Sequence, residues 1–523
     1  MTQMSKEIER GELHRTIWKI ANDLRGSVDG WDFKSYVLGM LFYRFISENL
    51  TSYLNAAERE AGNADFDYVT LARADAELGR KDVVDEKGFF ILPEDLFQNV
   101  RARSRTNTNL NETLARVFGN VEASAIGTPS EPDFKGLFDD LDVNSNKLGP
   151  TVAKRNEKLV KLLDAISGLP LGGAFGENTN DLFGDAYEYL MGMYASNAGK
   201  SGGEYYTPQE VSELLARIAV AGKTEVNKVY DPACGSGALL LKFAKVLGPD
   251  KVRNGFFGQE ISLTTYNLAR INMILHDVPY EKFDIANGDT LTDPAHWDDE
   301  PFEAIVSNPP YSLNWVGDGD ITLINDERYA PAGVLAPKGK ADLAFVMHML
   351  HWLAVDGTAA IVEYPGVLYR GGAEQKIREY LVRNNFVDAV IQLPPDLFFG
   401  TTIATCIIVL KKSKATSDVV FVEASREFVR GGNKNKVTSS NQWRILDALT
   451  ARVDVEHFVK IVPNDEVLAS SCKLSASAWV EGVDVREEVD NATLNAEIAQ
   501  TVSRQSDLRA RLDTLIAELE PEL

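Results

Sequence analysis

Four strand-like runs between residues 226 and 311 constrain the fold of this chain more than any other feature of its sequence. They cover residues 226–231, 255–260, 280–285 and 303–307, and helical sequence separates the earlier ones. This alternation predicts an α/β fold with a doubly wound, mostly parallel sheet. In such a sheet ligands bind outside the carboxyl ends of the strands, and short polar motifs follow these runs.

The first run ends in a glycine-rich turn that suits a bound ligand. The turn reads Asp231, Pro232, Ala233, Cys234, Gly235, Ser236 and Gly237. Its glycines let the backbone approach a ligand, although a dinucleotide-binding fold would carry a similar turn. Glu260 ends the second run and is placed to accept both hydroxyls of a ribose, and Asp289 follows the third and is placed to read an adenine edge. Both carboxylates would also suit solvated strand ends.

The fourth run is followed by Asn308, Pro309, Pro310 and Tyr311. The exocyclic amine of adenine is a poor nucleophile because the ring delocalises its lone pair. Two acceptors on that amine, the Asn308 side-chain oxygen and the Pro309 carbonyl, would favour its tetrahedral, nucleophilic form. Tyr311 would stack on a base flipped out of its duplex. The same residues would also form a plain loop with an Asn-Pro turn and a packed tyrosine.

The order and flanks of these motifs resemble the modification (methyltransferase) subunit of type I restriction–modification systems, N6-adenine class. The resemblance covers essentially the whole chain and is carried also by residues 31–45, 202–208, 340–345, 369–374 and 397–402. It implies S-adenosyl-L-methionine as the cofactor and N6-methyladenine in duplex DNA as the product. Tyr205 and Tyr206 stand where the family often has two phenylalanines.

The resemblance also implies which residues do the work. The cofactor would be bound by Glu204, Tyr205, Tyr206, Thr207, Pro208, Asp231, Pro232, Ala233, Gly235, Ser236, Gly237, Glu260 and Asp289. Thr207 and Glu210 have the spacing of a helix capping box, with Pro208 as the first helical residue. Tyr311 and Phe399 would stack on the two faces of the target base, although Phe399 also suits a buried core position.

The net charge of −23 is awkward for a chain expected to act on DNA. Lys and Arg contacts to phosphate supply the sequence-independent part of DNA affinity, and an acidic chain is repelled at long range. Either this protein binds no DNA, or a partner supplies most of the contacts, and the resemblance implies a partner. By resemblance it is a specificity subunit that reads the site and binds two copies of this chain. Without a nuclease or P-loop motif, cleavage and translocation would belong to a separate restriction/translocase subunit.

Periodicity divides the chain into four expected parts. Residues 1–165 form an N-terminal helical domain, 166–425 the methyltransferase domain, 426–485 a small C-terminal region, and 486–523 a C-terminal helical tail for partner docking. In the tail, apolar residues alternate four and three apart, which is typical of a coiled-coil seam. A helix packed on its own domain would show a similar stripe. Residues 312–340 lack periodicity, so we expect a mobile flap there.

Membrane contact and a metal site are not expected. No apolar run approaches the roughly 20 residues that span a bilayer. The first ten residues do not form a secretory signal, so we expect a cytoplasmic protein. Cys234, Cys406 and Cys472 lie far apart, and His348 and His351 lack an apparent third ligand, so no metal is expected.

Other functions stay open at this point. Asn-Pro-Pro-Tyr also occurs in methyltransferases that act on the N5 amide of a protein glutamine, which is another planar NH2 group. A non-catalytic cofactor-binding scaffold would keep the glycine-rich turn without the chemistry. N4-cytosine methylation is chemically adjacent, and the motif favours adenine.

Overall fold

A computed structural model describes residues 14, 15, 17, 30–169, 189, 207–398, 401–432, 434–482 and 491–519. The chain forms two units, Met1–Val480 and Glu481–Leu523. None of the helices in this described part has the length and apolarity needed to cross a membrane.

The N-terminal region of the first unit is helical. Its helices are α2 (Gly30–Glu60), α3 (Arg73–Leu78), α4 (Arg80–Lys87), α5 (Phe97–Ser104), α6 (Leu110–Ser124), α7 (Glu131–Phe134) and α8 (Val152–Ser167). Apolar side chains repeated along α2, among them Met40, Leu41 and Phe45, are buried in one core with those of α5, α6 and α8. The amphipathic pattern of the sequence therefore produces a packed helical region.

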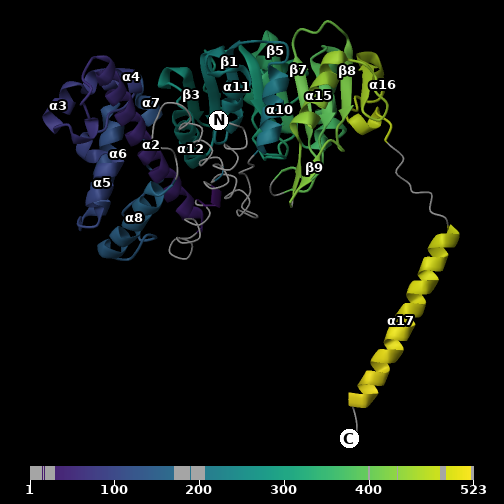
Figure 1. Cartoon of the computed structure of the whole chain (residues 1–523). Coiled ribbons are helices and arrows are strands. Elements are labelled where there is room, and N and C mark those ends of the chain that lie inside the picture. Colours follow the sequence, from purple (N-terminus) through teal and green to yellow (C-terminus); the bar gives the residue numbers. More distant parts are fainter. Residues whose placement is uncertain are drawn as a thin grey trace. The chain divides into compact units, whose positions relative to one another are not determined.

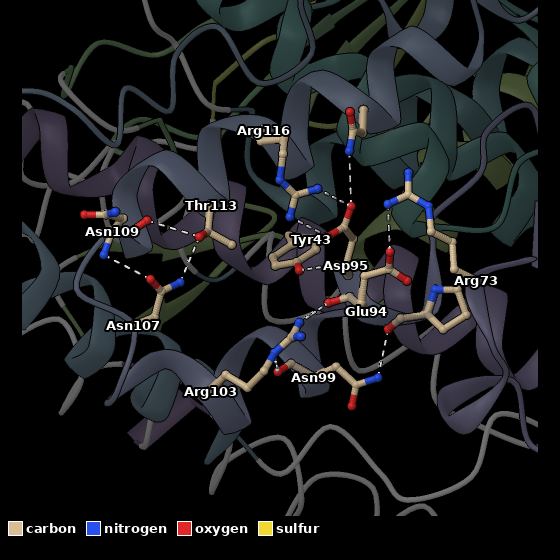
Figure 2. A network of polar contacts seen from close by, with 12 residues as sticks. Tyr43, Arg73, Glu94, Asp95, Asn99, Arg103, Asn107, Asn109, Thr113 and Arg116 are labelled. Atoms are coloured by element: carbon tan, nitrogen blue, oxygen red, sulfur yellow. Dashed lines mark hydrogen bonds and ion pairs between the residues drawn. The ribbon is translucent and has the colours of Figure 1, made fainter.

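A polar network surrounds the buried Asp95 side chain in this helical region (Figure 2). The Arg116 guanidinium donates to both oxygens of the buried Asp95 carboxylate, at 2.9 and 2.8 Å, and Asn120 adds a third bond at 3.2 Å. The Tyr43 hydroxyl of α2 donates to the Asp95 backbone carbonyl. Burial raises the pKa of Tyr43 well above its usual value, so the hydroxyl stays a donor. The network joins α2 and α6 through the turn at Pro93–Asp95.

Nine strands form one sheet in the order β11-β8-β6-β7-β5-β4-β1-β2-β3. Their bounds are β1 (Val226–Asp231), β2 (Val252–Glu260), β3 (Phe283–Asn287), β4 (Phe302–Ser307), β5 (Leu353–Glu363), β6 (Val387–Gln392), β7 (Cys406–Lys411), β8 (Asp418–Glu423) and β11 (Val459–Pro463). Five neighbouring pairs are parallel and three are antiparallel. The expected mostly parallel α/β sheet is confirmed.

Helices cover both faces of the sheet. One face packs against α10 (Gln209–Ala219), α11 (Ala238–Leu247), α12 (Leu263–Leu275) and α15 (Ser439–Ala451). The other packs against α13 (Asp342–Trp352), α14 (Ala373–Arg383) and α16 (Asn464–Ala469). Figure 1 shows α10, α11 and α15 on the same side of the strands. Two apolar cores, one on each face, therefore hold the sheet in place.

The helix α12 also packs against the N-terminal helical region. Its Leu268, Ile271 and Leu275 belong to the core of that region. Arg270, which is 1% exposed, donates to the carbonyls of Pro132 at 2.7 Å and Lys135 at 3.0 Å. One helix thus contributes to the sheet on one side and to the helical region on the other.

Two expectations about local structure need correction. The third strand lies at Phe283–Asn287 rather than at residues 280–285, because Pro279 begins a 3-10 turn over Tyr280–Lys282. Residues 312–340 are not the open loop that their lack of periodicity predicts. They contain three 3-10 turns, and Trp315, Leu323 and Tyr329 of this segment are buried in the core on the α13 face. Nothing in the local sequence pattern marks this packing, because it depends on distant partners. The expected mobility of the segment stays a prediction.

The C-terminal stretch of the first unit extends the sheet. Strand β11 pairs antiparallel with β8, and a two-stranded hairpin, β9 (Val429–Gly431) and β10 (Lys434–Lys436), projects from it. The second unit contains α17 (Asn491–Leu519). Leu494, Ile498, Leu508, Leu512 and Leu515 of α17 are between 43% and 58% exposed. Within this unit taken by itself, these side chains form an exposed apolar stripe along the helix.

Candidate active site

Strand register brings the sequence motifs to one edge of the sheet. Asp231 of β1 lies opposite Gly258 of β2, and Glu260 lies opposite Asn287 of β3. On the other side of β1, Tyr230 lies opposite Ile305 of β4, so the residues after β4 emerge beside Asp231. Because these strands are parallel, their carboxyl ends present the glycine-rich turn, Glu260 and Asn308 together.

The glycine-rich turn depends on backbone conformations that favour glycine. Gly235 and Gly237 have φ values of +54° and +73°, and Gly237 precedes α11. A Cβ on Gly237 would lie 3.0 Å from the Met273 methyl group of α12. The Glu260 carboxylate accepts the Gly235 N–H at 3.2 Å and the Ser262 N–H at 2.8 Å. Glu260 therefore both fixes the turn and places its charge at the rim of the turn.

The Asp231 carboxyl is buried beneath the turn. It accepts the Ala233 N–H at 3.0 Å and the Ser307 hydroxyl at 2.8 Å. Burial raises the pKa of Asp231 to about 7, and the nearby Glu260 charge adds to this effect. Sequence reasoning missed Ser307, whose only signal was a polar residue at the buried end of β4, directly before Asn308.

Asn308 is held from two sides. Its amide Nδ2 donates to the Thr207 hydroxyl at 2.9 Å, and its Oδ1 accepts the Tyr311 hydroxyl at 2.7 Å. The expected capping box of Thr207 and Glu210 is wrong, because α10 begins at Gln209 with Pro208 as its N-cap and no side-chain cap. The Thr207 hydroxyl bonds to Asn308 instead. Thr207 thus sets the orientation of the Asn308 amide.

A small cleft lies where these residues meet. It is lined by Thr207, Asp231, Ala233, Cys234, Gly235, Ser236, Ala238, Leu239 and Asn308. Among these lining residues none is Lys or Arg, and the one charged group is the Asp231 carboxyl. The Asp231 carboxyl and the apolar side chains of the lining suit a cationic ligand with apolar parts.

The remaining candidate residues lie around this cleft or outside the described part of the chain. Asp289 accepts the Leu291 N–H at 3.0 Å and the Thr292 hydroxyl at 2.9 Å, so it also shapes its own turn. The Pro232 carbonyl accepts the Thr290 hydroxyl at 2.6 Å. Pro309 is buried and Pro310 is half-buried. Glu204, Tyr205, Tyr206 and Phe399 fall outside the described residues.

Ile261 is a candidate that sequence reasoning missed. It follows Glu260 directly, and its side chain is 68% exposed. The Asn287 amide donates to the carbonyls of Glu260 at 2.8 Å and Ile261 at 3.2 Å, which fixes the turn that carries both. An exposed apolar side chain beside a strand-end carboxylate could have signalled a surface for a planar ring.

Comparison with known proteins gives consistent matches. Residues 178–488 match the family model described as N-6 DNA Methylase, and residues 13–166 match that of the HsdM N-terminal domain. The type I restriction enzyme MpnII methylase subunit of Mycoplasma pneumoniae is 48% identical over 98% of this chain and 97% of its own length. The MjaVII methylase subunit of Methanocaldococcus jannaschii is 30% identical over 99% of this chain and 85% of its own.

The fold of this chain also matches a solved structure over most of the length of both chains. The type I restriction–modification methyltransferase subunit from Streptococcus thermophilus is 34% identical, with a TM-score of 0.82. The match covers 90% of this chain and 100% of that one. It includes both the helical region and the sheet that carries the cleft.

Proposed function

Since this chain belongs to the N-6 DNA methylase family, as the methylase subunit of a type I restriction–modification enzyme, we propose that its cleft binds S-adenosylmethionine beside Asn308. The observation that carries the proposal is that Asp231, Gly235 and Asn308 line one cleft. The glycine-rich turn would bind the cofactor and the Asn-Pro-Pro-Tyr motif the target adenine, so that the two reactants lie next to each other. The cofactor supplies an activated methyl group there.

The residues of the cleft suit this cofactor. Its ammonium and sulfonium groups are cationic, and the buried Asp231 carboxyl lies in a lining without positive side chains. The Glu260 carboxylate, held by two backbone N–H groups, is placed to accept ribose hydroxyls. Ile261 would cover one face of the adenine ring, with Asp289 at its edge. The loop of residues 204–208 would close over the methionine part.

Asn308 and Pro309 would present two acceptors to the amine of the target adenine. The Asn308 Oδ1 already accepts the Tyr311 hydroxyl, but a carbonyl oxygen has a second lone pair for the amine. Positioning and fixed dipoles then favour the nucleophilic form of the amine. Methyl transfer to the nitrogen would break the methyl–sulfur bond and leave S-adenosylhomocysteine as a neutral thioether, and the nitrogen would then lose a proton to water. Tyr311 and Phe399 would stack on the flipped base.

The partners follow from charge and from α17. A chain with a net charge of −23 would reach duplex DNA through a specificity subunit that carries the positive contacts. The exposed apolar stripe of α17 would dock on that subunit, which would bind two copies of this chain. A separate restriction/translocase subunit would add cleavage. Residues 1–165, 166–425 and 426–485 would act as one body beside the tail of residues 486–523.

Transfer of labelled methyl from S-adenosylmethionine tests this proposal. The chain is assayed with duplex DNA, alone and with its specificity subunit, and the DNA is digested to nucleosides. We expect label in N6-methyladenine only when the specificity subunit is present. A parallel reaction offers a glutamine-containing peptide. Label in the peptide, or label in neither substrate, would contradict the proposal.

A further inference from the structure

A second group of potential ligands lies away from the methyl-transfer cleft. It consists of Asp284, near the start of β3, and His296 and Asp299, in the segment before β4. One ligand atom from each of the three side chains lies within 4.8 Å of the others. None of these residues lines the cleft or contributes to the binding of Asn308.

The orientation of the His296 ring is set by its surroundings. The side chain is 2% exposed, and its Nε2 lies 2.8 Å from the Gly258 carbonyl oxygen. Because a carbonyl only accepts, Nε2 carries a hydrogen and donates it. The rings of Tyr230 and Phe257 pack edge-on against the imidazole. Nδ1 is therefore aimed in one fixed direction, toward the two aspartates.

The distances at Nδ1 differ from those of a charged hydrogen bond. Nδ1 lies 3.5 Å from Asp299 Oδ2 and 3.7 Å from Asp284 Oδ2. An imidazolium N–H that donates to a carboxylate would hold the two atoms about 2.7–2.9 Å apart. A neutral ring would instead direct its Nδ1 lone pair at two anionic oxygens. Both carboxylates and the lone pair would be satisfied by one cation between them.

The same distances match the edges of a metal-coordination polyhedron. Nitrogen and oxygen ligands lie about 2.0–2.2 Å from a zinc ion, which places tetrahedral ligands about 3.4 Å from one another. Metal-bound histidines also commonly donate their other N–H to a backbone carbonyl, as His296 does. We propose that Asp284, His296 and Asp299 bind a divalent transition-metal ion of the Zn²⁺ or Mn²⁺ type. One imidazole with two carboxylates suits these ions.

Lys228 contacts one of these ligands, Asp299. Its Nζ donates to the Asp299 backbone carbonyl at 2.7 Å and lies 3.4 Å from Asp299 Oδ1. It thereby takes the oxygen of Asp299 that does not face His296, and Oδ2 stays directed at Nδ1. Asp284, whose side chain is 59% exposed, leaves an open side where water can complete the coordination.

The ion would act on stability rather than on methyl transfer. It would hold the segment of residues 288–301 to β3, next to α7 of the helical region, whose Asp133 lies close enough to Asp284 to feel its charge. Neutralising two carboxylates there would lower the repulsion at this junction. Because the ion would bind the folded chain and not the unfolded chain, it would raise the melting temperature.

The test uses the full chain after treatment with EDTA. Calorimetric titration with ZnCl2 and MnCl2 measures affinity, Co²⁺ absorption reports a nitrogen ligand, and thermal unfolding reports stabilisation. We expect one ion per chain and a melting temperature raised by several degrees. His296→Gln keeps an amide N–H for the Gly258 carbonyl but lacks the Nδ1 ligand. Asp284→Asn changes an exposed group, so its folding should be unaffected.

Both variants should bind at least about 100-fold more weakly, because even changes outside the ligand shell commonly cost 10–100-fold. Asp356→Asn, which removes an exposed carboxylate elsewhere, should bind as the unchanged chain does. Absence of binding to the unchanged chain at millimolar metal would overturn the proposal. So would equal affinity of Asp284→Asn and the unchanged chain, since the ion would then lie elsewhere.

Discussion

At the scale of single residues, the Asn308 amide is oriented by a threonine from another segment. Among the described residues, its side-chain partners are the Thr207 hydroxyl and the Tyr311 hydroxyl. Thr207→Val removes this acceptor at nearly constant volume. We expect kcat for methyl transfer to fall by up to about 100-fold, as small misplacements of reacting groups do. Thr207→Ser keeps a hydroxyl and should retain activity. Single-turnover assays would contradict this role if the valine variant matched the unchanged chain.

Asp231 gives the cofactor site a pH dependence. The pKa of Asp231 is raised to about 7 by burial, so the carboxyl is partly protonated near neutral pH. A cationic cofactor beside it favours the ionised form and lowers this pKa. Binding near pH 7 should therefore release up to about half a proton, and affinity should rise with pH until about pH 7 and then level off.

Calorimetry in phosphate and in Tris measures that proton, because the two buffers differ in ionisation enthalpy. Ser307→Ala removes a hydrogen bond that favours the ionised carboxylate, so the rise in affinity should shift to higher pH. A binding heat that is the same in both buffers would show that Asp231 keeps its protonation state.

Sequence reasoning reached some residues of the site and not others for a geometric reason. Asp231, Glu260 and Asn308 each follow a strand, and parallel strands bring such residues to one edge. The bond from Asn308 to Thr207 and the approach of Asp284 to His296 join segments without a fixed spacing. The metal ligands therefore escaped a search for short Cys and His motifs.

At the scale of elements, Arg270 of α12 joins the sheet domain to the N-terminal helical region. Arg270→Met would leave the carbonyls of Pro132 and Lys135 without their donor. A hydrogen bond from a charged group contributes about 1.5–3 kcal/mol, so losing these two should cost about 3–6 kcal/mol in the free energy of unfolding. Urea denaturation measures this loss.

Arg253→Met is the matched control for this change. Arg253 is 55% exposed and pairs with the exposed Glu225, a contact worth about 0–1 kcal/mol. An Arg270→Met variant that loses no more than the control would show that the apolar contacts of α12 alone join the two regions.

Some element boundaries can be predicted from the local sequence and others cannot. Strand β1 lies where its apolar run predicts it, because a buried strand between turn residues is a local pattern. The segment of residues 312–340 looks like a loop by the same criteria but is folded. Its Arg328 is buried and donates to the carbonyls of Thr290 and Leu291, which lie in a distant part of the chain.

At the scale of the whole molecule, we expect the first unit to fold without the second, and the second unit to be needed for assembly with the specificity subunit. A chain that ends at Gly482 keeps the sheet, both its cores and the helical region. We expect its melting temperature to match that of the full chain, while its complex with the specificity subunit is lost. Light scattering after size-exclusion chromatography measures the complex.

A substituted full-length chain controls for the truncation. Leu508→Gln with Leu512→Gln keeps the length of α17 but removes part of its exposed apolar stripe, and should weaken the same complex. Normal assembly of the chain that ends at Gly482 would place the docking surface in the first unit instead.

The proposed methyl transfer depends on Asn308, which would present an acceptor to the adenine amine next to the cofactor. The direct measurement is methyl transfer to duplex DNA by Asn308→Ala with the specificity subunit, alongside calorimetric titration of S-adenosylmethionine. We expect transfer to fall by at least about 100-fold, with cofactor affinity nearly unchanged. Asn63→Ala, the same change at an exposed position, should transfer normally. Transfer by Asn308→Ala at the rate of the unchanged chain would show that Asn308 is not the acceptor for the adenine amine.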